Sequence, residues 1–210
     1  MFRRQIEVIG EENQKILSSK KILIVGAGGL GNSIATNLSC IGLEKIYIVD
    51  FDIIEFHNIH RQFQFCKDDI GENKAAVLAE KLQKRGCNTK IEAVQGFFEE
   101  NIDIDVDIVF DATDNFEVRK KIDSFAKKRN IPWIYASVEE WHGQVGLFKT
   151  TSFEIFATKE HEVKGQIPAM VNLIGSISSL LGMKCLIGEC EEILYYVNFK
   201  DDLEIKKFSF

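Results

Sequence analysis

The sequence predicts an α/β fold, a doubly wound and mostly parallel sheet that antiparallel strands extend toward the C-terminus. Two continuous apolar runs, KILIVG (21–26) and KIYIVD (45–50), flank a helix-like segment at 31–42. Apolar strands joined by a helix are typical of a βαβ unit with a buried parallel sheet. Past Ser137 the helical segments give way to successive strand-like runs, which favours antiparallel pairing.

The other elements follow in order along the chain. In the middle of the chain, residues 72–86 predict a helix, 91–95 a short strand and 106–114 a buried strand. A second helix is predicted at 116–130 and a further strand at 132–137. The last third predicts strands at 144–150, 153–159, 193–199 and 203–210 and one apolar helix around 170–187, and residues 11–19 predict an N-terminal helix. Because no repeat or linker interrupts this pattern, residues 1–210 are expected to form a single Rossmann-like domain.

The composition is that of an ordinary globular protein, with 45% hydrophobic residues and a formal net charge of −6. This acidic balance argues against a nucleic-acid or anionic-membrane partner. No apolar run approaches the length of a membrane span and the N-terminus lacks a signal-peptide core, so a cytoplasmic location is expected. The five cysteines form no C-x-x-C pair, which predicts reduced thiols with neither a disulfide framework nor a zinc site.

The stretch ILIVGAGGLGN (22–32) predicts nucleotide binding. An apolar strand runs into a glycine-rich turn and then into a helix, whose first amides can hold phosphate oxygens. The glycines of this turn are Gly26, Gly28, Gly29 and Gly31. Asp50 ends the next strand, where a carboxylate can accept hydrogen bonds from ribose hydroxyls. These residues fit the ribose and phosphates of NAD or of ATP.

Polar residues after Asp50 favour a polyphosphate. Arg61 can present a planar fork of donors to phosphoryl oxygens, and Asn58 and Gln62 can orient them. Lys74 lies near the start of the next helix, where the helix dipole disfavours a cation unless an anion is present. In a dehydrogenase, the chain after this strand usually passes directly into a loop and the next helix. The additional phosphate-binding residues in this segment therefore favour ATP.

Carboxylates at a strand end supply an acidic side to this site. Asp111 and Asp114 lie at the carboxyl edge of a predicted central strand, where open α/β sheets bind ligands. Carboxylate oxygens facing phosphate-binding cations suit Mg²⁺. Asp114 or Asn115 could instead cap the following helix. Asp111 precedes that cap by too many residues, so it is the predicted magnesium ligand.

The ordered set GAGGLGN, VDFD, NIHRQ, Lys74 and DATDN resembles the ThiF/MoeB/HesA family, the bacterial relatives of ubiquitin-activating enzymes. The likeness covers nearly the whole chain, starting with RRQI at residues 3–6. It implies that the C-terminal glycine carboxylate of a small ubiquitin-fold sulfur carrier attacks the α-phosphate of Mg-ATP, giving an acyl-adenylate and pyrophosphate. ATP and Mg²⁺ are the implied cofactors. The short, zinc-free chain favours a ThiS-like carrier of thiamine biosynthesis over a MoaD-like carrier of molybdopterin biosynthesis.

The resemblance also implies a role for each site residue. These are Asp50 for ribose, Arg61 and Lys74 for phosphate, Asn58 and Gln62 beside them, Asp111 for magnesium, and Arg4 reaching the phosphates from the other subunit of a homodimer. The chain departs from the family in lacking paired C-x-x-C motifs and any cysteine in the loop before the late helix. We therefore expect no zinc and no covalent intermediate on a protein cysteine.

Three other functions stay open on the sequence alone. They are an NAD-dependent oxidoreductase, a non-catalytic binding subunit, and adenylation of a peptide or small acid. For the favoured function, residues 134–138, Gly143, Gln144 and the loop 158–168 are expected to line the channel for the carrier tail. Asp111→Ala and Lys74→Ala are expected to abolish adenylation with little change in stability, because both residues are predicted at the polar edge of the sheet.

Overall fold

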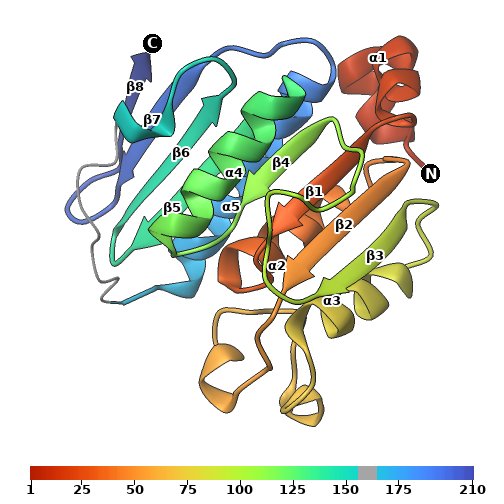
Figure 1. The fold of residues 1–210 in the computed structure, drawn as a ribbon, viewed down its shortest axis with the longest axis vertical. Coiled ribbons are helices and arrows are strands. Elements are labelled where there is room, and N and C mark those ends of the chain that lie inside the picture. The colour runs from red at the N-terminus through yellow and green to blue at the C-terminus, as the bar shows by residue number, and fades with distance from the viewer. Residues whose placement is uncertain (156–164) are drawn as a thin grey trace.

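One mixed sheet of eight strands organises the part of the chain that the structure describes, residues 1–155 and 165–210 of a computed structural model (Figure 1). The strands lie in the order β3-β2-β1-β4-β5-β6-β7-β8. Their bounds are β1 Lys21–Val25, β2 Lys45–Asp50, β3 Lys90–Gln95, β4 Ile108–Asp111, β5 Trp133–Glu139, β6 His142–Phe148, β7 Ile193–Asn198 and β8 Glu204–Ser209. The first five strands are parallel and the last three pair antiparallel. The predicted fold class is confirmed.

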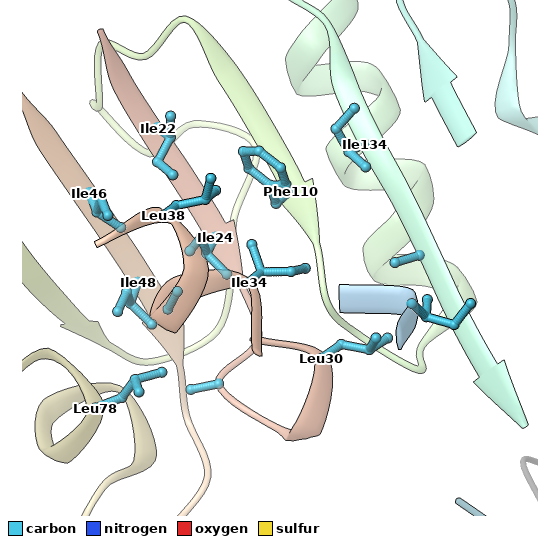
Figure 2. Packing of buried hydrophobic residues seen from close by; sticks show 14 of the residues in the cluster. Ile22, Ile24, Leu30, Ile34, Leu38, Ile46, Ile48, Leu78, Phe110 and Ile134 are labelled. Atoms are coloured by element: carbon cyan, nitrogen blue, oxygen red, sulfur yellow. The ribbon is translucent and has the colours of Figure 1, made fainter. Parts of the chain in front are cut away.

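Helices cover both faces of the sheet, because side chains alternate along each buried strand. In β1, Ile22 and Ile24 join one buried cluster and Leu23 and Val25 join the other. Helices α2 (Gly29–Leu38), α3 (Lys74–Gln83) and α5 (Pro168–Leu186) pack on the first face, and α4 (Phe116–Arg129) packs on the second. Figure 2 shows the first cluster, where isoleucines of β1 and β2 meet leucine and isoleucine side chains of α2.

The N-terminal helix α1 is longer than predicted and begins at Arg3 rather than near residue 11. It runs over Arg3–Leu17 with a break at Gly10, whose φ of 82° a glycine adopts readily. The amides of Gln5 and Gln14 both donate to the carbonyl of Ile41, at 2.8 and 3.0 Å. Helix α1 therefore packs beside the loop that enters β2, at the amino ends of the parallel strands.

Helix α5 corrects the expectation that no segment approaches a membrane span. It has 19 residues and a mean hydropathy of 1.4, enough for a spanning helix by length and composition, although half of this window is buried inside the domain. It packs against α2, β5 and β6. Gly175 and Gly182 allow the close approach, because a Cβ at these positions would lie 2.4 Å from Ser33 Oγ and 2.2 Å from Phe110 Cζ. A helix buried in the core of a soluble domain has the same apolar composition.

The expectation of unpaired thiols is wrong for four of the cysteines. Cys40 and Cys87 form a disulfide with a Cα–Cα distance of 5.3 Å, and Cys185 and Cys190 form a second with a distance of 4.0 Å. The first pair meets because α2 and α3 start at the same edge of the sheet and pack together, so their C-terminal ends lie side by side. The second pair meets because the chain turns back just after α5, at Gly188 with a φ of 102°.

The strand predicted at 153–159 is also wrong where the structure describes it. Phe153–Ile155 form a 3-10 turn, and 156–164 lie outside the described residues. The alternating apolar residues fit a strand, but Phe153 packs between Trp133 and Phe148 in the second cluster. Side-chain burial, rather than sheet pairing, accounts for the apolar pattern here.

Candidate nucleotide-binding site

A cavity of about 430 Å³ opens at the carboxyl ends of the parallel strands. Its wall combines the glycine turn after β1, the ends of β2 and β5, the segment before α3 and the loop between β4 and α4. Open α/β sheets bind ligands at this edge, because loops diverge there and helices begin there. All of the sequence-predicted site residues except Arg4, Gly31 and Asp111 line this cavity.

The glycine turn requires glycine at two positions for steric reasons. Gly26 has a φ of +99°, and a Cβ there would lie 2.6 Å from the carbonyl oxygen of Ala112. A Cβ at Gly31 would lie 2.0 Å from the carbonyl oxygen of Gly26, so any larger residue would push α2 away from the turn. Gly28 forms the N-cap of α2 without a side-chain cap, which leaves the first amides of the helix free for a ligand.

Asp50 fixes the glycine turn to the end of β2. Its Oδ2 accepts from the amide of Ala27 at 2.5 Å and its Oδ1 accepts from the amide of Asp52 at 2.7 Å. Burial raises the pKa of this carboxyl, and the two backbone hydrogen bonds and the Lys74 charge oppose that rise. Each carboxylate oxygen has a second lone pair, so Asp50 can also accept a hydroxyl from a ligand in the cavity.

Gln62 presents a buried amide with an unpaired oxygen in the cavity wall. The residue is 2% exposed, and its Oε1 has no hydrogen-bond partner among the described residues. Its Nε2 lies 3.8 Å from the position of a Cβ on Gly28, beside the N-terminus of α2. A buried polar atom without a partner is costly, so this amide indicates a ligand at the glycine turn.

Arg61 and Asn58 lie on the same wall. Arg61 Nε donates to Gln166 Oε1 at 2.9 Å and its Nη1 donates to the carbonyl of His57 at 3.2 Å. Burial lowers the pKa of this guanidinium and the charge of Asp114 opposes the shift. Asn58 is buried and its Oδ1 accepts from the amide of Glu55, so it also shapes the turn that carries Arg61.

Lys74 begins α3 and is 7% exposed. Its Nζ contacts Asp52 Oδ2 at 2.7 Å, and this carboxylate offsets the unfavourable position of a cation at a helix N-terminus. The side chain of Asn73 caps α3 by accepting from the amide of Ala76. Lys74 is therefore held at the cavity by its own helix and by the loop after β2.

Contrary to the prediction, Asp111 does not face the cavity. It is 0% exposed, its Oδ1 accepts from the amide and hydroxyl of Thr113, and its Oδ2 accepts from Arg119 Nε at 2.9 Å. Burial raises the pKa of this carboxyl, and the charge of Arg119 and the Thr113 hydrogen bonds oppose it. Asp111 is therefore not at the exposed polar edge of the sheet, where the expectation of little change in stability placed it. Removing one partner of a buried ion pair is destabilising, so Asp111→Ala should lower the stability.

Asp114 supplies the carboxylate that reaches the cavity. It is exposed and lines the wall, while the adjacent Asn115 caps α4 by accepting from the amide of Val118 at 3.0 Å. The capping role considered for Asp114 therefore falls to Asn115. The segment that contains both carboxylates does reach the cavity wall, but the exposed carboxylate is that of Asp114, three residues after Asp111.

Sequence reasoning missed two features of the wall. Arg119 lies one turn inside α4, and the only sequence signal for it is an arginine placed shortly after the DATDN segment. Phe51 and Phe97 are exposed at the cavity mouth and stack with ring centroids 4.2 Å apart. Stacked aromatic rings at the ends of β2 and β3 offer a flat apolar surface to a nucleobase.

Gly143 and Arg4, which the sequence assigns to the channel and to the partner's site, do not line this cavity. Gly143 packs on the first face instead, where a Cβ would lie 2.2 Å from Ile174 Cδ1 of α5. Arg4 lies in α1 with a 91% exposed side chain that pairs with Glu7, at the opposite edge of the sheet from the cavity. Ser137 and Val138 do line the cavity, and most of the loop 158–168 lies outside the described residues.

The fold and the cavity define an α/β domain of the nucleotide-binding class, with the cationic side chains of Arg61 and Lys74 in the cavity wall. The chain belongs to the ThiF family, whose family model matches residues 2–208. The adenylyltransferase and sulfurtransferase MOCS3 of Caenorhabditis briggsae is 37% identical over 153 residues, which cover 70% of this chain and 38% of that protein. The sulfur carrier protein adenylyltransferase of Thermus thermophilus is 28% identical over 219 residues, covering 93% of this chain and 80% of that protein.

Solved structures share the fold. Escherichia coli MccB with ATP superposes with a TM-score of 0.78 at 20% identity, covering 94% of this chain and 65% of that one. MccB with MccA gives a TM-score of 0.83 at 18% identity, covering 99% and 70%. The chain thus spans well under half of the Caenorhabditis relative and about two thirds of MccB.

Proposed function

We propose that the protein is an ATP-dependent adenylyltransferase that activates the C-terminal glycine carboxylate of a ubiquitin-like sulfur carrier. The products are an acyl-adenylate and pyrophosphate. The observation that carries this proposal is one cavity where Arg61, Lys74 and the N-terminus of α2 face the same space as an exposed carboxylate, Asp114. Family membership and the names of the relatives, which include a sulfur carrier protein adenylyltransferase, support it.

The residues of the cavity fit ATP and Mg²⁺. The uncapped start of α2 would hold phosphate oxygens and Asp50 would hold the ribose. The unpaired Oε1 of Gln62 would accept a hydrogen bond from a donor group of the nucleotide. Asp114 is the carboxylate best placed for Mg²⁺, because both oxygens of Asp111 already have protein partners. Mg²⁺ bound with ATP would neutralise charge on the phosphates.

In this reaction the protein positions the carrier carboxylate and ATP and neutralises charge on the phosphates. It does not supply a nucleophile. The attacking carboxylate is already ionised near neutral pH, so no general base is needed. Arg61 and Lys74 would stabilise the charge that develops on the phosphates. Ser137 and Val138, at the end of β5, would hold the end of the carrier tail beside the phosphates.

A ThiS-like carrier is the finer proposal, and a MoaD-like carrier or a peptide or small acid is the alternative. Pyrophosphate exchange into ATP, measured with each candidate acid in turn, separates them. Exchange with the ThiS-like carrier alone supports the finer proposal, and exchange with another carrier transfers the same chemistry to that pathway. Tight NADH binding without any exchange would replace the proposal with an oxidoreductase.

We also propose that the active unit is a homodimer in which Arg4 completes the partner's site. Arg4 is exposed and its helix lies at the opposite edge of the sheet from its own cavity, so a role in ATP binding would require the site of another subunit. Arg4→Ala and Lys74→Met dimers should each be nearly inactive, but subunit exchange between them should restore about a quarter of the wild-type rate, because half of the dimers then contain one intact site. No recovery after confirmed exchange would remove Arg4 from the site.

A further inference from the structure

Arg119 is a buried arginine of α4 that joins three segments of the cavity wall. Its Nε donates to Asp111 at the end of β4, and its Nη2 donates to the carbonyls of Thr113 at 2.6 Å and Ala136 at 3.3 Å. Its guanidinium carbon lies 4.9 Å from the ring centroid of Tyr135. The side chain is 12% exposed. One planar group therefore fixes the end of β4, the loop that follows and the end of β5.

The charge of Arg119 is already matched inside the protein. Asp111 is fully buried against it, so the pair brings no net charge to the cavity. Arg61 differs, because its hydrogen-bond partners among the described residues are the neutral amide of Gln166, a backbone carbonyl and the ring of His60. Arg61 is thus suited to bind an anion, whereas the geometry of Arg119 is suited to hold backbone in place.

The segments that Arg119 holds carry functional positions of the proposed site. Asp114 follows Thr113 directly, and Ser137 follows Ala136 directly. We propose that Arg119 is a positioning residue that places the Asp114 carboxylate for a divalent cation bound with ATP, an inference that rests on the proposed function. Within residues 1–155 and 165–210, Arg119 makes no hydrogen bond to the glycine turn, Arg61 or Lys74, so its effect on ATP binding should be confined to the cation side of the site.

The test is the affinity for ATP, measured by calorimetry with and without Mg²⁺, in an Arg119→Lys variant. Lysine keeps a positive charge for Asp111 but cannot bond two carbonyls through a planar fork. The gain in ATP affinity on adding Mg²⁺ should fall by about tenfold, as for other residues that orient metal ligands. The affinity without Mg²⁺ should stay within about twofold of wild type.

Arg129→Lys is the matched control, because Arg129 also lies on α4, donates to a backbone carbonyl, that of Ile102, and covers the ring of Phe125, away from the cavity. It should leave both affinities unchanged. Unchanged Mg²⁺ dependence in Arg119→Lys, or equal losses with and without Mg²⁺, would overturn the inference.

A second variant keeps the test decisive if Arg119→Lys does not fold. Asp114→Asn changes an exposed side chain, so the domain should fold normally. It should abolish the Mg²⁺-dependent gain, and full retention of that gain would leave Arg119 with no carboxylate to position. A wild-type protein that binds no ATP would refute the proposed function itself, whereas ATP binding with an unchanged Arg119→Lys variant would refute only the role of Arg119.

Discussion

Removing the charge of Asp111 should destabilise the whole domain. Asp111→Asn keeps the shape of the side chain and can still accept from Thr113, but it leaves the Arg119 guanidinium buried without its anion. Breaking a buried ion pair by removing one partner costs about 3–5 kcal/mol. Because Arg119 keeps two carbonyls and an aromatic ring, the lower end applies, about 3 kcal/mol, or about 6–12 °C in melting temperature for a domain of this size.

Urea unfolding at neutral pH measures this change directly. Glu80→Gln is the control, since it removes one member of an exposed ion pair with Lys84 and should change the free energy of unfolding by less than about 0.5 kcal/mol. In an Arg119→Met background, Asp111→Asn should cost less than about 1 kcal/mol, because the charge left unpaired in the single variant is absent. A single variant as stable as wild type, or an equal cost in both backgrounds, would refute the reasoning.

Three further predictions follow from buried or paired groups elsewhere. Lys74→Met should stay folded, as its melting curve would show, while pyrophosphate exchange falls at least about a hundredfold; near-normal exchange would remove Lys74 from the site. Burial raises the pKa of Glu192, but hydrogen bonds from the Thr150 hydroxyl and from three backbone amides outweigh it and lower the pKa to about 2. The stability that Glu192 adds is therefore present above about pH 4.5 and lost as the pH falls toward 2. Glu192→Gln should therefore unfold at lower urea than wild type at pH 6 with a difference that shrinks by pH 3, and a constant difference would contradict this. Cys40→Ser should lower the free energy of unfolding in oxidising buffer by about 4 kcal/mol, because its disulfide joins positions 47 apart in sequence; Cys66→Ser, at a free and exposed thiol, should change little.

The glycine turn and the fold class could be predicted because their causes are local. Gly26 and Gly31 are required by backbone contacts within the turn and with the neighbouring strand end, and the apolar runs of β1 and β2 are continuous since both faces are buried. The cations Arg61 and Lys74 could be predicted because they lie in the polar segment that follows Asp50 and in the first turn of the next helix. Residue type and position therefore predicted most of the cavity wall that contains the glycine turn and these two cations.

The acidic side could not be assigned residue by residue. Whether Asp111 or Asp114 faces the cavity depends on Arg119, which reaches back from α4 to enclose Asp111. The disulfide between Cys40 and Cys87 has a similar cause, since it depends on two helices packing side by side. These features depend on contacts between segments of the chain that are not adjacent in sequence. They could not be predicted from the periodicity or the motifs of any one segment.

Transfer of AMP to the carrier is the most direct test of the proposed function. The protein would be incubated with Mg²⁺, ATP labelled at the α-phosphate and a ThiS-like carrier, and the carrier would be separated under acidic conditions that preserve an acyl-adenylate. Label should appear on the intact carrier, be absent from a carrier lacking its C-terminal glycine, and be lost with Lys74→Met. A folded wild-type protein that binds ATP but labels neither this carrier nor a MoaD-like one would contradict the proposal that it activates a ubiquitin-like sulfur carrier.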